Sequence, residues 1–265
     1  MTAEERPRFT EAISSVMNDT REYLDNLSLI PRNRDADIVL LALLSKSIVA
    51  TEAIVSLVSN GFDDEAYGVC RTCLEIQLTV RYLTNKESDA RCSRFLKFFT
   101  RNKSDWFDLI AKYYPSMQPT KQKAATYREL AQSYRDPHKW AEGRKSLKAF
   151  ASEPDYFETR NDGSPLDANF YYEVLYKWMS FYVHGTISAL EEEHVTIDGD
   201  VFSVHPRRGR STHGEDALRT SMLSVHLNLL RVLRNLNMEY PESLSSKFEN
   251  AVKQLSAKSK GNVTA

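Results

Sequence analysis

Polar and apolar positions separate with helical spacing most clearly in residues 171–188. At about 100° per residue, five polar side chains fall on one narrow line, Glu173, Lys177, Ser180, His184 and Ser188. Aromatic and aliphatic side chains cover most of the remaining circumference, which is typical of a helix with neighbours on several sides. We therefore expect this helix at the centre of the fold. Its polar line then faces water, a partner helix or a ligand, and a solvent-facing edge is the simplest of the three.

Helical periodicity along the rest of the chain predicts an all-α protein. The predicted helices cover residues 9–24, 36–60, 65–84, 87–113, 120–135 and 215–238, with a last helix that ends near 256. Gly61 follows the second of them, where glycine favours a helix C-terminus. Only 9 glycines and 9 prolines occur in 265 residues, which agrees with a high helix content. The helix at 87–113 is expected to bury an apolar side made of Phe95, Phe98, Phe99, Trp106, Leu109 and Ile110.

A short β-ribbon is predicted before the penultimate helix. Asp198-Gly199 is the best hairpin signal in the chain, and apolar residues flank it on both sides. Because an isolated two-stranded ribbon is marginally stable, we expect it to pack on the helices. The predicted fold class is an all-α, multi-helix bundle with a small two-stranded β-hairpin. We expect a single helical domain, 1–265, with its core at 36–190, the hairpin at 191–206 and the C-terminal helices at 214–256.

Composition and charge exclude several classes of protein. A net charge of −1 argues against a strongly basic nucleic-acid binder. Three cysteines do not make a disulfide framework and fit a reducing cytoplasm. The N-terminal residues lack the apolar core of a signal peptide. Lys46 and Glu52 interrupt the most apolar region, 38–58, which indicates a buried helix rather than a membrane span. The expected location is the cytoplasm, with no membrane partner.

Charge is unevenly distributed in the second half of the chain. Residues 121–148 hold eight basic and three acidic side chains, whereas residues 153–173 hold six acidic side chains and Arg160. The two segments could be complementary surfaces within one fold, or a basic groove beside an acidic rim. Solvated faces are the simplest interpretation.

Arg71 and Glu75 stand one helical turn apart within an otherwise apolar side of the helix at 65–84. Charged side chains rarely enter a packed face unpaired. We expect either an internal ion pair that orders the bundle or a partly wet site.

Cys70 and Cys73 have the C-x-x-C spacing of redox and metal sites, but they lie inside a predicted helix. Thioredoxin-type chemistry requires such a pair at a helix N-terminus, where the thiol pKa is lowered. A zinc site requires two further ligands, and no second paired motif provides them. We predict that these cysteines are small core residues, and we expect no metal and no cofactor.

Arginine and histidine recur with four to six residues between them. Arg207 and Arg208 both reach His213 in this way, and Arg219 reaches His226 over two helical turns. The motif R-x(4–6)-H marks ribonucleases of the HEPN class, but about one match is expected by chance in such a chain. Arg219 and His226 share one helical face, so we expect them to be partly buried together. They are an alternative candidate site, although a core histidine is the simpler interpretation.

Two short motifs combine along the chain. An early helix carries R-x-x-x-E, and a later one carries a tyrosine-rich approach to S-x-x-x-H-G, on Arg71, Glu75, Tyr82, Tyr176, Ser180, His184 and Gly185. This pattern resembles a bacterial helical family catalogued only as a domain of unknown function, over about 36–190. That family is similar in outline to HEPN-like bundles, many of which act in stress or phage defence. The chain departs from the HEPN motif at Lys177, where an arginine would stand, which argues against ribonuclease activity.

Two classes of function follow. As an enzyme acting on RNA or a nucleotide, the chain would use His184 as general acid or base. Lys177 or Arg71 would stabilise phosphate charge, and Ser180 would orient the histidine. As a non-catalytic binding module, the same Arg, Glu, Ser and His side chains would form a buried network that fixes helix register. Its partner would be another protein or a second copy, held by the basic segment 121–148 or by the hairpin.

Overall fold

The computed structural model of the chain describes residues 5–28, 34–116, 118–131, 147–153, 171–177, 179–180, 195–198, 201–204 and 213–256. The α-helices in these residues are α1 (Glu5–Ser28), α2 (Asp35–Ser59), α3 (Asp63–Asn85), α4 (Ser88–Tyr113), α5 (Gln118–Ala131), α6 (Leu147–Ala151), α9 (His213–Asn235) and α10 (Glu242–Ser256). The other elements are a π-helical segment, η1 (Tyr171–Tyr176), and two strands, β1 (Val195–Asp198) and β2 (Val201–Val204). The predicted all-α bundle is confirmed.

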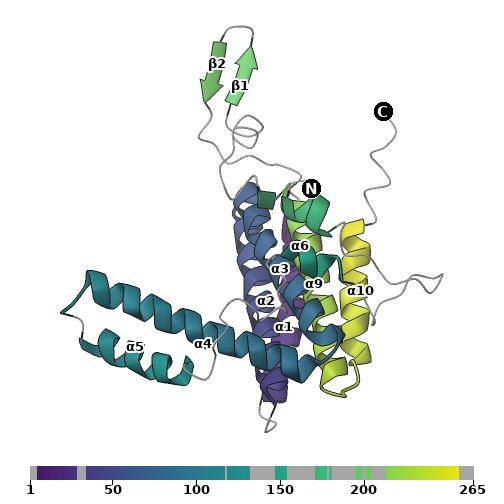
Figure 1. Cartoon of the computed structure of the whole chain (residues 1–265). Helices are drawn as coiled ribbons and strands as arrows, with labels where there is room; N and C mark the ends of the chain where they lie inside the picture. Colours follow the sequence, from purple (N-terminus) through teal and green to yellow (C-terminus); the bar gives the residue numbers. More distant parts are fainter. Residues whose placement is uncertain are drawn as a thin grey trace.

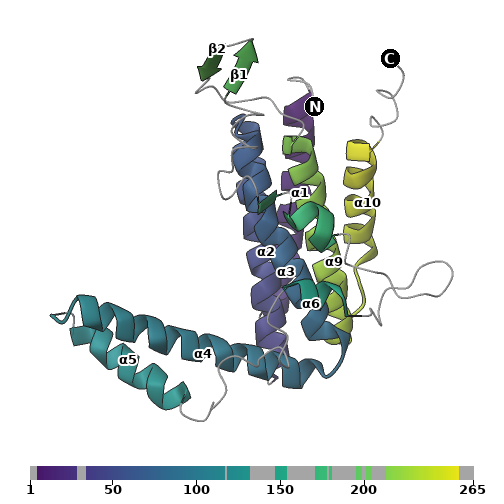
Figure 2. The same ribbon diagram turned by 45° about the horizontal axis from the view of Figure 1, so that its top comes forward.

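Five of the described helices, α1, α2, α3, α9 and α10, run along one another and form the bundle (Figures 1 and 2). α2, α3 and α9 contact one another at its centre, α1 covers α2, and α10 covers α1 and α9. α3 and α9 run in the same direction, because Cys70 contacts the Ala217 carbonyl near their starts and Ser224 donates to Gln77 further along. Side chains with no solvent exposure fill this centre, among them Leu40, Leu44, Ile54, Leu74, Val80, Leu218, Met222 and Leu229.

The described part of the segment with the polar line is not at the centre, contrary to the prediction. This part, 171–177 and 179–180, lies against α3 and α6 at the edge of the bundle. Met179 is fully buried there, but Tyr176 and Ser180 are only half-buried and Lys177 is exposed. The apolar stripe of α9 takes the central place instead. Periodicity indicates how much of a helix is apolar, but it does not indicate which neighbour covers it.

α2 ends where the sequence predicts. Gly61 has a φ of +78°, in the left-handed region that glycine adopts without strain. Its N–H donates to the Val58 carbonyl at 3.0 Å, and the Phe62 N–H donates to the Leu57 carbonyl at 2.9 Å. These two bonds make a Schellman motif, which satisfies carbonyls that the end of the helix leaves open. The chain then turns directly into α3, whose first turn carries three acidic side chains at the positive end of the helix dipole.

α4 leaves the bundle after its first turns and forms, with α5, an arm that projects sideways (Figures 1 and 2). We define the arm as residues 96–131. The rings of Phe107 and Tyr127 stack with their centroids 5.5 Å apart, and Arg128 of α5 pairs with Asp108 of α4. Ser104 is buried beneath these contacts. α5 therefore covers one side of α4 along most of the arm.

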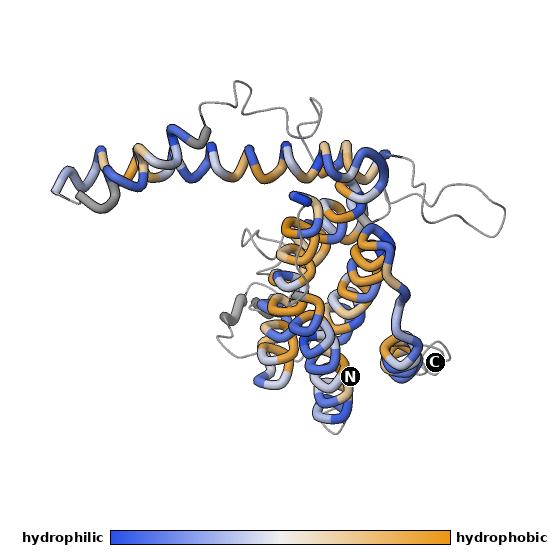
Figure 3. Tube along the Cα trace, turned by 90° about the horizontal axis from the view of Figure 1, so that it is seen from below, coloured by the Kyte–Doolittle hydropathy of each residue, from blue (hydrophilic) through white to orange (hydrophobic). Residues whose placement is uncertain are grey.

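The prediction that α4 buries its aromatic side is wrong for the arm. The side chains of Phe99, Trp106 and Leu109 are 45%, 56% and 51% exposed. Figure 3 shows hydrophobic positions recurring along the arm beyond the bundle. Only Phe95, near the base, packs against the core. The amphipathic pattern of α4 is real, but α5 lies on the opposite side of the helix, so the apolar side faces solvent.

The predicted fold class is corrected for the hairpin. β1 and β2 pair antiparallel, from Val195 opposite Val204 to Asp198 opposite Val201. The two strands stand beyond the end of the bundle in both views, and they are not packed on it (Figures 1 and 2). The packed architecture is therefore all-helical, and the hairpin is no part of it. The marginal stability of short ribbons, on which the prediction rested, gives no information about where such a ribbon lies. The domain boundaries stay a prediction.

α2 is the one described helix that is long and apolar enough to cross a membrane. Half of its most apolar stretch is buried inside the bundle, and a core helix meets the same criteria of length and composition. α1, α3, α4 and α9 all contact it. Its outer side keeps Ile38 and Val49 exposed. The helix predicted to be buried at 38–58 is therefore buried where α1, α3, α4 and α9 contact it, and it is exposed on its outer side.

Candidate functional site

Arg71, Glu75 and Tyr176 form a closed triad between α3 and η1. The Arg71 guanidinium donates from Nε to Glu75 Oε1 at 3.1 Å and from Nη2 to the Tyr176 hydroxyl at 2.8 Å. The Tyr176 hydroxyl donates in turn to Glu75 Oε1 at 3.0 Å. The Tyr172 ring stacks on the Tyr176 ring with centroids 5.1 Å apart. Two of the predicted site residues are therefore brought together, and Tyr176 joins them from the later motif.

The triad is partly wet, and its charges are matched. The Arg71 side chain is 21% exposed and the Glu75 side chain 38% exposed. Burial raises the pKa of the Tyr176 hydroxyl, and the Glu75 carboxylate raises it further. Burial lowers the pKa of Arg71, but Tyr176 and Glu75 more than compensate, so the net shift is upward. At neutral pH Tyr176 is therefore a neutral donor between a carboxylate and a guanidinium, and it is not activated as a nucleophile.

The other predicted residues of this site lie apart from the triad or outside the described residues. Ser180 donates its hydroxyl to the Tyr176 carbonyl at 2.7 Å, within its own helix. Lys177 pairs with Glu173, which Lys148 of α6 also contacts at 2.9 Å. The hydrogen bonds from Lys177 and Lys148 lower the pKa of Glu173. This exposed cluster does not include Arg71. His184 lies outside the described residues, so its place in the site stays a prediction.

Arg219 and His226 bond to different partners, and their role as an alternative site stays a prediction. Arg219 donates to Glu215 at 3.0 Å and to the Leu255 carbonyl of α10 at 2.6 Å. His226 Nδ1 lies 2.9 Å from the Tyr240 hydroxyl, and burial lowers the pKa of the imidazole. Both side chains are half-buried, as expected. Arg219 holds α9 to α10, and His226 holds α9 to Tyr240 in the segment before α10. Arg207 and Arg208, which precede His213 in the other matches, lie outside the described residues.

No pattern in the sequence predicts the most buried ion pair in the described part of the chain. Arg91 in α4 donates to Glu153 after α6 at 2.9 Å, and the two side chains are 0% and 3% exposed. Asn85 donates to the same carboxylate oxygen at 3.0 Å, and Arg81 donates to the Glu153 carbonyl at 2.6 Å. Glu153 was predicted as part of a solvated acidic face, and this prediction is wrong. The contact joins residues 62 positions apart, so local pattern cannot indicate it.

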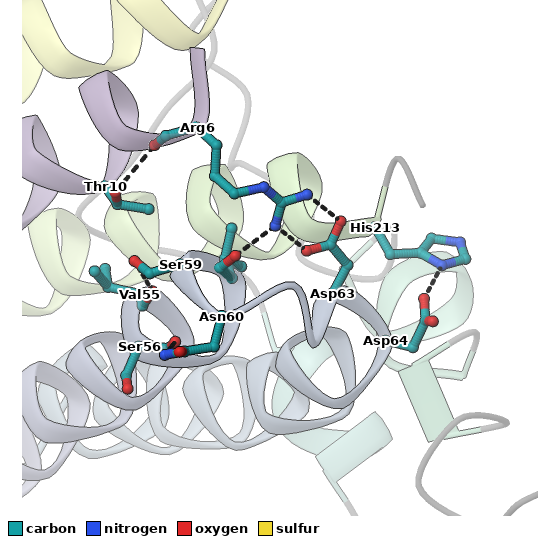
Figure 4. Close-up of polar contacts among 10 residues, drawn as sticks. Arg6, Thr10, Val55, Ser56, Ser59, Asn60, Asp63, Asp64 and His213 are labelled. Carbon is teal, nitrogen blue, oxygen red and sulfur yellow. Dashed lines mark hydrogen bonds and ion pairs between the residues drawn. The ribbon is translucent and has the colours of Figure 1, made fainter. Parts of the chain in front are cut away.

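A second buried ion pair closes the end of the bundle where α1, α3 and α9 begin (Figure 4). Arg6 binds the Asp63 carboxylate with two nitrogens, at 2.5 and 2.9 Å, and also donates to the Val58 carbonyl. Asp63 has no solvent exposure, and its hydrogen bond raises the pKa of Arg6. Beside it, His213 stacks on Tyr67 and contacts Asp64 at 3.1 Å. These contacts join three helix starts and have a structural role.

A shallow groove runs from Arg6 along α1. Its volume is about 850 Å³, and polar side chains dominate its lining, including Thr10, Ser14, Asn18 and Asp19. The positive charge of Arg6 is already matched by Asp63. Asp19 pairs with Lys247 of α10. The groove therefore presents no concentrated charge that would select a ligand.

Cys70, Cys73 and Cys92 are buried free thiols. Burial raises the pKa of the Cys73 and Cys92 thiols to about 12, and it also raises that of Cys70. Such thiols are poor nucleophiles and poor metal ligands at neutral pH. The prediction that Cys70 and Cys73 are core residues is confirmed. Among the residues that the structure describes, no group of three or more His, Cys, Asp or Glu side chains could hold a metal ion.

Comparison with known proteins identifies a family without assigning a function. No curated protein and no solved structure matches the chain. One family model, described as a family of unknown function (DUF5677), matches residues 37–202. The match contains both motifs that carried the resemblance. It extends beyond the 36–190 range of that resemblance and includes part of the hairpin. Since more than half of its residues lie within this match, the chain belongs to the family of unknown function DUF5677.

Proposed function

We propose that this protein is a non-catalytic helical interaction module that binds a protein partner through the outer side of α4. One observation carries the proposal, which is that the arm leaves Phe99, Trp106, Leu109 and Tyr113 exposed along one side of a helix. Monomeric proteins rarely leave large apolar side chains gathered in water, and such patches mark sites of interaction. The bundle is then the support, and the arm is the binding element.

The exposed side chains form one stripe along α4. At about 100° per residue, the side opposite Ser104 collects seven apolar side chains, Phe95, Phe98, Phe99, Trp106, Leu109, Ile110 and Tyr113. We call these seven residues the α4 stripe. α5 covers the side that carries Ser104, Phe107 and Asp108. Phe95, at the base, packs against the core, and the rest of the stripe is available to another molecule.

Buried contacts at the base of α4 hold the arm in a defined direction. Arg91, in the first turn of α4, pairs with Glu153, and Asn85 at the end of α3 donates to the same carboxylate. All three side chains are buried. Because α4 is fixed to the bundle in this way, a partner can bind the stripe without first paying to order the helix.

The geometry of the triad supports a structural role rather than catalysis. Arg71, Glu75 and Tyr176 bond to one another, and Ser180 bonds within its own helix. A general base or a nucleophile must present its reacting atom to a substrate. A closed triad of this kind links η1 to α3, as expected of the polar network in a binding module.

The proposal is tested by the binding of anilinonaphthalene sulfonate, a fluorescent probe of exposed apolar surface. The dilute wild-type protein should enhance the fluorescence of the probe, and the double variant Trp106→Glu/Leu109→Glu should lose most of the enhancement. The matched control is Ile38→Glu/Val49→Glu, which removes two equally exposed apolar side chains from α2. Equal loss in both double variants, or no loss in the arm variant, would contradict a binding surface on α4.

A second candidate function is an RNA- or nucleotide-acting protein of HEPN-like outline, in stress or phage defence. The observation that favours it is the partly wet edge of α3, where Arg71 and Glu75 lie beside η1, which precedes His184 in the sequence. Incubation of the purified protein with a mixed RNA pool and with nucleoside triphosphates tests this candidate. Cleavage by the wild type that disappears in His184→Ala would favour it over the interaction module. Both candidates are proposed for the cytoplasm.

A further inference from the structure

We infer that the partner bound by the α4 stripe is a second copy of this chain, paired antiparallel along α4. This inference rests on the proposed function, since it names the partner of the same surface. It goes beyond that proposal because it fixes the stoichiometry, the orientation and the register of the complex.

The spacing of the stripe is that of a helix that pairs with another helix. Large side chains follow one another at alternating steps of four and three residues, at Phe95, Phe99, Asn102, Trp106, Leu109 and Tyr113. Phe99, Trp106 and Tyr113 stand seven residues apart, which is the heptad repeat of a coiled-coil seam. A straight helix of the partner, rather than a loop or an extended peptide, therefore fits the stripe. The second copy supplies such a helix with the same repeat.

The area of the stripe suits a dimer of this kind. Phe99, Trp106, Leu109 and Tyr113 together expose roughly 500 Å² at their 45%, 56%, 51% and 68% exposure, against about 800 Å² per partner in an interface of standard size. The half-exposed Phe98 and Ile110 and the flanks of the helix add to this area. The open part of the stripe, from Phe98 to Tyr113, spans about 22 Å at 1.5 Å per residue, so two copies can pair along it.

The position of the arm selects the antiparallel arrangement. The bundle stands at the N-terminal end of α4, and the arm projects away from it (Figures 1 and 2). A parallel pair would bring two bundles to the same end of the paired helices. An antiparallel pair puts them at opposite ends, and the two copies are then related by a two-fold axis, the commonest symmetry of soluble homo-oligomers.

Polar residues near the middle of the stripe fix the register. Asn102 is the one polar residue in the heptad positions, and a single buried asparagine can set the register of a coiled coil. In a pair centred near residue 103 the two copies of Asn102 lie about 3 Å apart along the axis, within reach of each other's side-chain amide. Arg101 and Asp105 stand two residues before and two residues after residue 103. Both lie beyond the same edge of the stripe, 3.2 Å apart within one copy. In an antiparallel pair centred near residue 103, Arg101 of each copy meets Asp105 of the other.

Charge contributes little to the strength of the dimer. In the same arrangement Arg94 meets Lys112 of the other copy at each end of the seam, a contact between like charges. Exposed ion pairs contribute about 0–1 kcal/mol each, so the central attraction and the terminal repulsion largely offset each other. The burial of the apolar stripe stabilises the pair, and the dissociation constant should depend little on salt concentration.

Sedimentation equilibrium of the full-length chain tests the inference. We expect the wild type to be a dimer, and we expect Leu109→Glu to raise the dissociation constant at least ~100-fold, because it places a carboxylate in an apolar seam. Val49→Glu is the matched control, since Val49 and Leu109 are both 51% exposed and only Leu109 belongs to the stripe. Val49→Glu should leave the dimer intact. Circular dichroism and thermal unfolding confirm that both variants are folded.

Cross-linking tests the orientation and the register. Asn102→Cys should form a disulfide-linked dimer on mild oxidation, because in a pair centred near residue 103 the two copies of residue 102 lie only about 3 Å apart along the helix axis, on the seam side. Lys121→Cys, an exposed position on α5 away from the stripe, should form no disulfide-linked dimer under the same conditions. The three native cysteines are buried with raised thiol pKa values, so they do not compete in the reaction. A dimer that resists Leu109→Glu, or one in which only Lys121→Cys cross-links, would overturn the inference.

A maleimide reaction at Leu109→Cys separates failure of this inference from failure of the proposed function. One outcome is a protein that is monomeric at every concentration and whose new thiol, introduced by Leu109→Cys, reacts as fast as the thiol of Lys121→Cys. This outcome would overturn the dimer and would still support an exposed binding surface. A monomer in which the new thiol is protected would overturn both, since the stripe would then be covered within one chain.

Discussion

Arg91 and Glu153 form an ion pair that is closed to solvent at the junction of α3, α4 and α6. Arg91 Nη2 lies 2.9 Å from Glu153 Oε1. The guanidinium also lies over the Tyr82 ring, with its carbon 3.9 Å from the ring centroid, and Tyr82 stacks on Phe150. One carboxylate thus holds together the end of α3, the start of α4 and the segment after α6.

Glu153→Ala should strongly destabilise the protein. Removing one partner of a buried ion pair leaves the other charge uncompensated, which costs about 3–5 kcal/mol. Glu75→Ala is the matched control, because Glu75 also pairs with an arginine but its side chain is 38% exposed. Its loss should cost no more than about 1 kcal/mol. Urea unfolding followed by circular dichroism measures both free energies of unfolding. Similar values for the two variants would contradict the difference in burial.

The sequence predicts the elements of this junction but not their contacts. The helix at 87–113 and its amphipathic pattern follow from periodicity, and so does the glycine that ends α2 at residue 61. Glu153 was assigned to a solvated acidic segment, since its neighbours along the chain are polar. Its burial depends on Arg91 and Asn85, more than 60 residues away. In the same way, the pattern of α4 marks an apolar side, but only the placement of α5 shows that this side is open.

Gly214→Ala should destabilise the start of α9 through Asp63. A Cβ atom at residue 214 would lie 2.6 Å from the Asp63 side-chain carbon, and Arg6 holds that carboxylate in place with two hydrogen bonds. Overpacking of this kind typically costs about 1–3 kcal/mol. Thermal unfolding of Gly214→Ala, Asp63→Ala and the double variant measures the coupling. The glycine substitution should cost much less in the Asp63→Ala background. Equal costs in both backgrounds would show that the clash is not with Asp63.

The stability of the protein should fall as the pH is lowered below about 6.5, in part through His226. Burial lowers the pKa of His226 in the folded protein. The unfolded chain therefore binds a proton at a higher pH than the folded chain, and stability is lost as the pH falls through the unfolded value. The neutral imidazole contacts the Tyr240 hydroxyl at 2.9 Å. His226→Gln should flatten this part of the profile when the melting temperature is measured from pH 8 to pH 5. An unchanged slope would assign the effect to other groups.

The candidate sites illustrate what residue spacing can and cannot establish. The i,i+4 spacing of Arg71 and Glu75 correctly predicts a pair on one helix, because one helical turn brings such side chains into contact. The spacing of Arg219 and His226 places both on one side of α9, but α10 and Tyr240 occupy them separately. The expected central position of the helix at 171–185 rested on its apolar girth. α9 is as apolar on its inner side, and α3 contacts both α9 and η1; nothing in either pattern decides which of the two takes the central place.

His184 is where the two candidate functions differ most clearly in outcome. On the proposed function, wild-type protein is inert toward a mixed RNA pool and toward nucleotides, and His184→Ala changes neither this result nor dimer formation. On the enzymatic alternative, the loss of a general acid or base lowers the rate about a hundredfold to ten-thousandfold, which a cleavage assay detects easily. Leu109→Glu provides the complementary variant, since it should abolish pairing and leave any cleavage at the α3 edge unchanged.

If the wild type cleaves RNA, and if His184→Ala stops cleavage while the protein stays folded and dimeric, the helical interaction module is not the principal function. Cleavage lost only in His226→Ala would instead locate the chemistry on the side of α9 that faces α10.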